Sequence, residues 1–322
     1  HLDGTPMTKE DAFETANKIL NELEQKLGRG IIPNWIGPQR FGGTRGVTSE
    51  VGKRVLEGDF ESAVNTYIGM DGAQEDENVR EFRKSWRENG NPDEILENMP
   101  ERLSFEKEMI KHLVKRNEDW VGAFKKLPGN LQLMCIHAAQ SEAFNKILAM
   151  RIENGMSLST PSLGDVVLGI SKNGQVIKDR VALVSKENMK RIKLNCQKNR
   201  LVITGALPGS DYLLTDSEPR IIEEKIIKDM DLDKCTFRVE EIPRLSSRGT
   251  RRPLITKYGD LTVETVENVE LENDSKKWEN GPKEGDRWHP EGGSVRFRFS
   301  LPPGSYATII MREFMQSPLT HY

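Results

Sequence analysis

The chain has 322 residues, of which 36% are hydrophobic and 30% charged, a balance typical of a globular protein with a solvated surface. This length exceeds what one compact core usually holds, so we expect two domains or one domain with a large insertion. No apolar run approaches the roughly 18 residues that a membrane span requires, and no apolar segment typical of a secretory signal follows the N-terminus. A membrane partner is therefore not expected, and the predicted location is the cytoplasm.

Three cysteines and five histidines limit the redox and metal chemistry that the chain can carry. Cys135, Cys196 and Cys235 are too few and too widely spaced for a disulfide framework, and they fit a reducing cytosol. The histidines form no cluster at the spacing of metal ligands. We therefore expect no metal site.

The net charge of −3 comes from 47 basic and 50 acidic residues that are unevenly distributed along the chain. Six basic residues and one acid lie from Lys26 to Arg54, and five basic residues and no acid lie from Ile242 to Lys257. When basic and acidic residues are separated in this way, an acidic protein can still present a basic face that binds the phosphate backbone of a nucleic acid. The counts alone fit ordinary surface charge equally well.

The first predicted element is a helix from Thr8 to Leu27, where apolar residues recur at helical spacing and Thr8 with Asp11 can form an N-terminal cap. Gly28 ends this helix. The segment 31–43 is rich in glycine and proline around aromatic residues, which is typical of a loop with a specific conformation.

The pattern from Ser49 to Asn154 is mostly helical, and its strongest segment runs from Leu131 to Ile152, with Gly155 as the expected C-terminal cap. Short apolar runs typical of strands follow between Val166 and Thr204. The chain therefore changes from helical to strand-like character near its middle.

Near the C-terminus, alternating apolar residues from Val295 to Leu301 predict a half-buried strand. A turn at 302–304 leads into a predicted closing helix from Ser305 to Met315. Helices and strands without a regular βαβ repeat indicate an α+β fold.

The segment from Gly46 to Arg54 superficially resembles a phosphate-binding P-loop. However, five rather than four residues separate its glycines, and Arg54 stands where that motif needs a Ser or Thr for Mg²⁺. No strand is predicted before the segment either. The sequence therefore excludes a P-loop, and it contains no G-x-S-x-G elbow of a serine hydrolase.

Six blocks of distinctive sequence occur along the chain. The longest specific one is Pro33-Asn34-Trp35-Ile36-Gly37-Pro38-Gln39-Arg40-Phe41-Gly42, and the others are 138–145 (AAQSEAFN), 164–167 (GDVV), 203–210 (ITGALPGS), 249–252 (GTRR) and 298–308 (RFSLPPGSYAT). The first block is similar to the signature PN(Y/F)FGxQRFG of the TruD family of tRNA pseudouridine synthases, and the others resemble blocks of the same family in the same order. The long helical stretch after Val51 is similar to the archaeal and eukaryotic branch of the family.

The resemblance implies a pseudouridine-synthase catalytic sheet interrupted by a large inserted TRUD domain. It places residues 1–50 and 251–322 in the catalytic domain and residues 51–250 in the insertion. It also implies an isomerase that converts uridine to pseudouridine, at position 13 of tRNA, without a cofactor or metal. An aspartate attacks the flipped-out nucleotide, and extruding a base from its stack costs a few kcal/mol, which the pocket must recover. The implied partner is tRNA, with no obligatory protein partner.

The resemblance also implies roles for residues of the signature loop. Asn34 is expected to bond the target base or orient the aspartate, although an asparagine here can equally cap the turn. Ile36 stands where the family usually has a phenylalanine that stacks on the base, so any base contact of Ile36 lacks π stacking. Gln39, Arg40 and Phe41 are expected to shape the loop and contact RNA, with Arg40 paired either to a phosphate or to a buried carboxylate.

Four basic residues are candidates for contact with the RNA backbone: Arg45, Lys53, Arg251 and Arg252. The alternative for each is an ordinary solvated cation. Phe144, Tyr306 and Ile309 have the spacing of core residues rather than of site residues.

The catalytic aspartate of the family lies in a G-x-K-D-K segment upstream of the signature loop, and no such segment precedes Pro33. Asp3 and Asp11 are the only aspartates there, and neither has a matching context. No catalytic residue is therefore expected within this chain, and the nucleophile is expected upstream of His1. Two functions remain open: part of a working tRNA pseudouridine synthase, or a non-catalytic RNA-binding protein that retains the fold.

Overall fold

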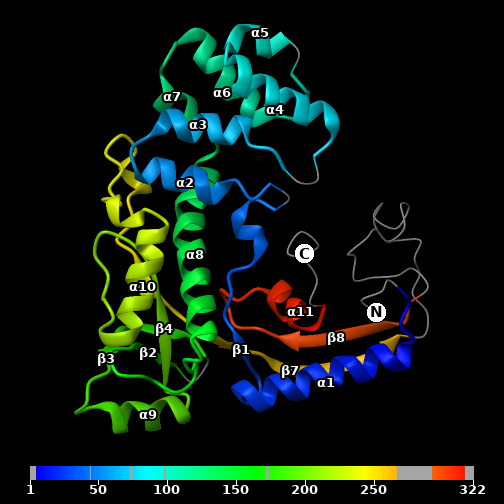
Figure 1. Cartoon of the computed structure of the whole chain (residues 1–322), viewed down its shortest axis with the longest axis vertical. Coiled ribbons are helices and arrows are strands. Elements are labelled where there is room, and N and C mark those ends of the chain that lie inside the picture. The colour runs from blue at the N-terminus through cyan, green and yellow to red at the C-terminus, as the bar shows by residue number, and fades with distance from the viewer. Residues whose placement is uncertain are drawn as a thin grey trace.

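The computed structural model describes residues 5–43, 45–72, 75–97, 99–171, 174–266 and 292–315. These residues form two lobes, which Figure 1 shows side by side: a larger lobe of helices stacked on a sheet, and a smaller lobe built on a long two-stranded ribbon. The combination of separate helical and antiparallel parts confirms the predicted α+β class.

The upper part of the larger lobe is helical, as the sequence predicts between 49 and 154. Its elements are α2 (Thr48–Leu56), α3 (Phe60–Gly69), α4 (Glu77–Asn89), α5 (Pro92–Glu97), α6 (Ser104–Lys115), α7 (Trp120–Phe124) and α8 (Gly129–Glu153). The long α8 contains the predicted 131–152 segment and is followed by Gly155 at φ +69°. One apolar core extends through these helices, and α8 carries it down to the sheet (Figure 1).

The lower part of the larger lobe is an antiparallel sheet of four strands in the order β3-β2-β4-β5. Its elements are β2 (Val166–Ile170), β3 (Val176–Leu183), α9 (Met189–Gln197), β4 (Leu201–Leu207), α10 (Ser217–Asp229) and β5 (Thr250–Pro253), with short 3₁₀ turns η2 (Leu232–Lys234) and η3 (Pro243–Leu245) before β5. The strands confirm the apolar runs predicted between 166 and 204. Neither α9 nor α10 is predicted from the sequence pattern.

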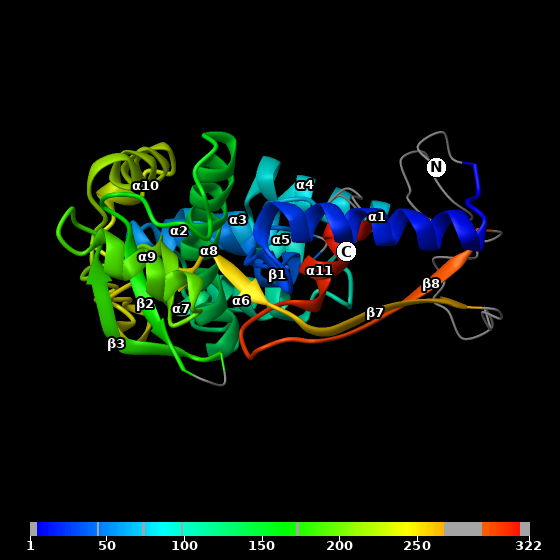
Figure 2. The ribbon, with the colours of Figure 1, turned by 90° about the horizontal axis from the view of Figure 1, so that it is seen from below.

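The smaller lobe joins the two ends of the chain. Its elements are α1 (Lys9–Leu27), β1 (Ile31–Pro33), the 3₁₀ turn η1 (Pro38–Phe41), β6 (Ile255–Lys257), β7 (Gly259–Val266), β8 (Ser294–Ser300) and α11 (Ala307–Met315). β7 and β8 pair as an antiparallel ribbon along which α1 lies, and β1 pairs with β6 (Figures 1 and 2). Residues far apart in the sequence therefore share one lobe.

The ends of α1 form as their residues predict. The Thr8 hydroxyl accepts a hydrogen bond from the Asp11 backbone N–H at 3.1 Å, which satisfies one of the free donors of the first turn. Gly28 closes the helix at φ +101°, a conformation that residues with a Cβ rarely adopt. The alternation predicted from Val295 to Leu301 is also confirmed, since apolar residues of β8 are half-buried and Arg296 and Arg298 are exposed.

Gly52, the second glycine of the excluded P-loop pattern, has a packing role. It lies in the middle of α2, where the helix crosses α8, and a Cβ at this position would lie 1.9 Å from the carbonyl oxygen of Cys135. Only glycine lets the two helix backbones approach so closely. Its presence in this sequence is therefore explained by helix packing rather than by phosphate binding.

We expect Gly52→Ala to lower the free energy of unfolding by about 2–4 kcal/mol, since α2 must move away from α8 and expose part of the core. Alanine alone would favour the helix by about 1 kcal/mol, so the sign of the effect tests the close contact. Urea unfolding would measure it, with Glu61→Ala on the exposed side of α3 as the control. A stability equal to or above that of the wild type would contradict this packing.

Within the described residues, none of the helices combines the length and apolar character that crossing a bilayer requires.

Candidate nucleic-acid interface

A groove of about 1460 Å³ lies between the two lobes. The larger lobe contributes the 158–160 turn, the hairpin end of β2 and β3, the 196–203 segment and β5, and the smaller lobe contributes the end of α1, β1, β6 and the 300–305 turn. Figure 2 shows the sheet of the larger lobe adjoining the long ribbon of β7 and β8. Asn34, the second residue of the signature, lines this groove.

The charged residues that line the groove are all basic. They are Arg29, Lys198, Arg200, Arg252 and Lys257, and no Asp or Glu occurs among the described residues of the lining. Four of these side chains are exposed, and Arg252 is partly buried. A concave surface with one sign of charge raises the local concentration of a ligand of opposite charge. The electrostatics of the groove therefore favour a polyanion.

Asn34 is held at the end of β1 by a network that connects three segments. Its side-chain N–H donates to the Pro253 carbonyl at 3.0 Å, and its side-chain oxygen accepts from Arg252 Nη2 at 2.7 Å. Its backbone N–H donates to the Leu254 carbonyl at 2.8 Å. The amide retains one N–H and one lone pair for a further partner. The geometry thus fixes the Asn34 amide at the wall of the groove, where the residue is 6% exposed.

Arg252 is the centre of this network. Its Nη2 also donates to the Gly304 carbonyl at 3.1 Å. One guanidinium therefore joins the signature loop to the Pro-Pro-Gly turn of the 298–308 block. The guanidinium lies over the Phe144 ring, 5.5 Å from its centroid, which favours a cation. Burial lowers the pKa of Arg252 to about 10, so the side chain remains charged at neutral pH. No acceptor among the described residues bonds to Nη1.

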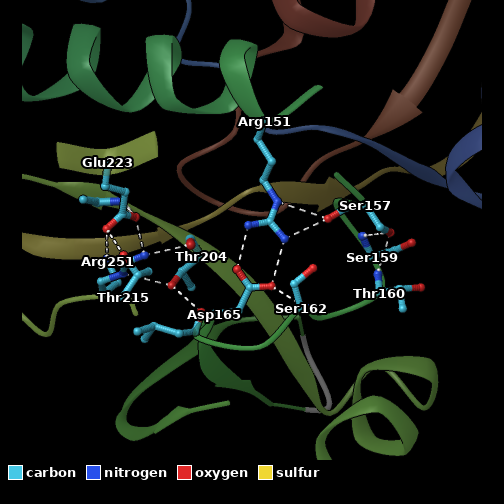
Figure 3. A network of polar contacts seen from close by, with 12 residues as sticks. Arg151, Ser157, Ser159, Thr160, Ser162, Asp165, Thr204, Thr215, Glu223 and Arg251 are labelled. Atoms are coloured by element: carbon cyan, nitrogen blue, oxygen red, sulfur yellow. Dashed lines mark hydrogen bonds and ion pairs between the residues drawn. The ribbon is translucent and has the colours of Figure 1, made fainter. Parts of the chain in front are cut away.

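Arg251, the neighbour of Arg252, points to the other face of the sheet and is buried. Its Nη1 and Nη2 donate to the two Glu223 oxygens at 2.9 and 2.7 Å, and its Nη2 and Nε donate to the carbonyl and hydroxyl of Thr204 (Figure 3). With a further bond from Nη1 to the Leu213 carbonyl, all five N–H groups have acceptors. This placement argues against the predicted contact of Arg251 with RNA, because no donor is left for a phosphate.

A second buried pair stabilises the start of β2. Arg151 on α8 donates to both oxygens of Asp165 at 2.6 and 2.8 Å and, through Nε and Nη2, to the Ser157 carbonyl. Asp165 also accepts from the Ser162 backbone N–H at 2.7 Å (Figure 3). The Gly-Asp block at 164–165 is therefore explained by a buried ion pair that ties the sheet to α8.

Ile36 packs in the core and not on the groove. Its side chain is only 5% exposed and lies in an apolar cluster with Phe144 and Leu148. The Asn145 side chain bonds both the backbone N–H and the carbonyl of Ile36, each at 2.9 Å. This clamp explains why the Phe-Asn pair of the 138–145 block accompanies the signature loop. It also argues against the predicted packing of Ile36 on a base.

The next residues of the loop face α8 and α11 rather than the groove. Arg40 donates to the Tyr306 hydroxyl at 3.3 Å, and the exposed Gln39 accepts from the Thr308 hydroxyl at 3.3 Å. Phe41 packs at the edge of the same apolar cluster as Ile36. Among the described residues Arg40 pairs with no carboxylate, which argues against the predicted buried ion pair, and its contact with a phosphate stays a prediction.

Arg45 and Lys53, the two remaining predicted backbone contacts, both have carboxylate partners. Arg45 Nη1 lies 2.9 Å from Glu106, and its Nη2 donates to the Tyr67 carbonyl, which ties the segment after the signature loop to the helical part. Lys53 Nζ lies 3.1 Å from Asp231. Neither residue lines the groove. Their placement gives both a structural role, which argues against phosphate contact at these positions.

The residues predicted to belong to the core do so. Phe144 and Ile309 are buried, and Tyr306 is half-buried against the same clusters.

Two cations of the groove, Lys198 and Arg200, lie outside both basic segments that the sequence pattern singled out. They belong to a third acid-poor segment, from Lys186 to Arg200, with six basic residues and one acid. This segment is as dense in positive charge as the other two, but it falls between strand-like runs and outside the motif blocks. A count of basic and acidic residues in a window moved along the whole chain would have identified this segment.

No group of three or more His, Cys, Asp and Glu side chains arranged to hold a metal occurs in the parts of the chain that the structure describes.

Comparisons with known proteins agree with these motif blocks. A family model described as "tRNA pseudouridine synthase D (TruD)" matches residues 2–314. A protein of Methanosarcina acetivorans named "Probable tRNA pseudouridine synthase D" is 36% identical over 304 residues, covering 94% of this chain and 65% of the relative. A protein of the same name from Thermococcus sibiricus is 33% identical over 307 residues, covering 95% of this chain and 65% of the relative.

The fold has a matching crystal structure, that of the putative TruD protein from Methanosarcina mazei. The two superpose with a TM-score of 0.82 at 30% sequence identity, over 98% of this chain and 67% of the other. The chain thus spans about 65% of the length of the curated relatives it matches. Family model, identity and fold all agree, and the chain belongs to the TruD family of tRNA pseudouridine synthases.

Proposed function

We propose that this chain forms the greater part of a tRNA pseudouridine synthase, an isomerase that converts a uridine of tRNA to pseudouridine, at position 13 by family resemblance. The observation that carries the proposal is the acid-free groove in which Arg252 fixes the Asn34 amide of the signature loop. Such a groove offers cations for a backbone and an oriented amide for a base. The reaction as proposed uses neither a metal nor a cofactor.

In this proposal the residues of the groove divide into two roles. Arg29, Lys198, Arg200 and Lys257 hold phosphates, since their exposed side chains have no carboxylate partner among the described residues. Asn34 and Arg252 position the target nucleotide. In the family, the nucleophilic aspartate is supplied by a G-x-K-D-K segment that precedes the signature loop.

We further propose that residues 1–50 and 251–322 belong to one catalytic domain and that residues 51–250 are inserted into it. The pairing of β1 with β6 and the contact of α1 with β7 support this division. β5 pairs with β4 across the second boundary, so the two parts share a backbone hydrogen-bond ladder there.

The test uses the full-length product of the gene that encodes this chain, incubated with unmodified tRNA. Pseudouridine at a single uridine is the expected result, detected by carbodiimide derivatisation followed by mass spectrometry because the isomerisation itself does not change the mass. It should be lost when the upstream aspartate is changed to alanine. Product that forms equally in the aspartate variant would refute the proposed mechanism.

The alternative is a non-catalytic RNA-binding protein that retains the fold, and the basic groove fits this function as well. It predicts salt-sensitive binding of tRNA and no pseudouridine from the full-length protein. Affinity for tRNA equal to that for an unrelated polyanion would contradict both functions.

A further inference from the structure

The solvent side of α9 carries a dense row of cations outside the groove. Lys190, Arg191 and Lys193 are exposed on this helix, and Lys186 is exposed just before it. The only acid nearby in the sequence is Glu187, which is also exposed. Within the described residues, none of the four cations forms an ion pair. We define Lys186, Lys190, Arg191 and Lys193 as the α9 ridge.

The packing of α9 forces these cations outward. Ile192 is buried, and Met189 and Cys196 pack with it against the sheet, in the same apolar cluster as Val167 and Ile203. Because the apolar stripe of the helix faces the protein, its remaining positions must face solvent. The sheet thus fixes the backbone of the ridge, and its long side chains extend into solvent, where they can reach a partner.

The ridge is continuous with the groove. α9 ends at Gln197, and the next residues, Lys198 and Arg200, line the groove before β4 begins. The helix of 9 residues is about 13 Å long. Figure 1 shows α9 at the end of the larger lobe away from α5 and α6, beside the sheet. An extended anion bound in the groove can therefore continue along the ridge.

We infer that the α9 ridge binds the phosphate backbone of a double-helical arm of the RNA whose target nucleotide occupies the groove, an inference that rests on the proposed function. The exposed residues of α9 include no aromatic side chain, and aromatic stacking is what single-stranded RNA usually requires. Double-stranded RNA is instead recognised through its phosphates and 2′-hydroxyls, which lysine and arginine can contact without reading sequence.

An anionic membrane is the competing partner for a basic helix, and the structure disfavours it. A helix that lies on a membrane needs a broad free apolar face. The apolar stripe of α9 is already covered by the sheet, and Leu194 is the one large apolar side chain that α9 leaves exposed. The ridge therefore offers charge without the apolar surface that membrane insertion requires.

The test compares two variants with the same change in net charge. The ridge variant is Lys190→Gln with Arg191→Gln and Lys193→Gln, and the control is Lys115→Gln with Lys125→Gln and Lys126→Gln, three exposed cations near α6 and α7 at the other end of the lobe. Binding of tRNA, of a short RNA duplex and of a single-stranded RNA is measured by fluorescence anisotropy over a range of salt concentrations. Thermal unfolding checks that both variants fold.

We expect the ridge variant to bind tRNA roughly tenfold or more weakly at about 0.1 M salt, and the slope of log K against log salt to fall by about two to three. Binding of the duplex should be lost, whereas binding of the single strand and all binding by the control should change little. Equal tRNA binding by the ridge and control variants would overturn the inference while leaving the proposed function intact. Loss of binding to phosphatidylserine vesicles with unchanged tRNA binding would overturn it in favour of a membrane.

Failure of the proposed function has a different signature. In that case the wild-type protein would bind tRNA no more tightly than heparin, independently of the result for the ridge variant.

Discussion

Arg251→Ala is expected to lower the free energy of unfolding by about 3–5 kcal/mol, because it leaves the Glu223 carboxylate buried without its opposite charge. The side chains of Arg251 and Glu223 are 4% and 6% exposed, so water cannot easily replace the lost partner. Ala206 and Thr215 would still donate to Glu223 at 3.1 and 2.8 Å, but neither carries charge. Denaturant unfolding followed by circular dichroism would measure the loss.

A matched control lies three residues away. Arg248 pairs with Asp211 at the surface, where the two side chains are 82% and 67% exposed, so Arg248→Ala should cost less than about 1 kcal/mol. Replacing both buried partners, as Arg251→Met with Glu223→Leu, should recover much of the stability that Arg251→Ala loses. If Arg251→Ala lowered the free energy of unfolding no more than Arg248→Ala does, the buried pair would not be the interaction that stabilises β5 against α10.

The second large effect is expected at Arg252 and concerns activity. Arg252→Ala removes the donors that hold the Asn34 oxygen and the Gly304 carbonyl, so the signature loop and the Pro-Pro-Gly turn lose their common anchor. A displacement of about 1 Å at a reacting group can lower a rate by roughly 100-fold. We expect a loss of that size in kcat/KM for pseudouridine formation by the full-length protein, mostly in kcat.

Two further variants separate positioning from simple charge. Arg252→Lys keeps the charge but cannot reproduce the planar fork that reaches both acceptors, so we expect little rescue of kcat. Lys257→Ala removes an exposed cation of the same groove and should raise KM and lower the salt slope by about one, with kcat nearly unchanged. Full kcat in Arg252→Lys would show that the charge alone matters at this position.

The different roles of Arg251 and Arg252 could not be predicted from the sequence. Both arginines follow a glycine in an acid-free segment, and charge counting treats them alike. Successive side chains of a strand point to opposite faces, so within β5 one arginine must face the groove when the other faces α10. Which one does so depends on the register of β5 against β4, where Arg251 pairs with Ala206 and Arg252 with Gly205.

The environment of Ile36 also depends on tertiary structure. The motif places this residue in the signature loop, and the loop was correctly predicted to have a specific conformation. Whether its side chain meets a ligand or the core depends on Asn145, a residue 109 positions away whose amide clamps the backbone of Ile36. A contact at such separation leaves no local pattern in the sequence.

Local patterns were enough to predict the α+β class, the helical stretch from 49 to 154, the strands between 166 and 204, and the family, because hydrophobic periodicity, capping residues and ordered motifs are local properties of the chain. They also located the glycine, proline and asparagine residues of the signature loop. They did not predict α9, α10, β5, β6 or β7.

The surroundings of the charged groups depend on the tertiary structure. It brings Lys198 and Arg200 together with Lys257 of β6 and with Arg29, which follows α1, in one groove. It also pairs Arg45, Lys53 and Arg251 with carboxylates. A charge acts on the groups near it in space, and the fold alone sets those distances.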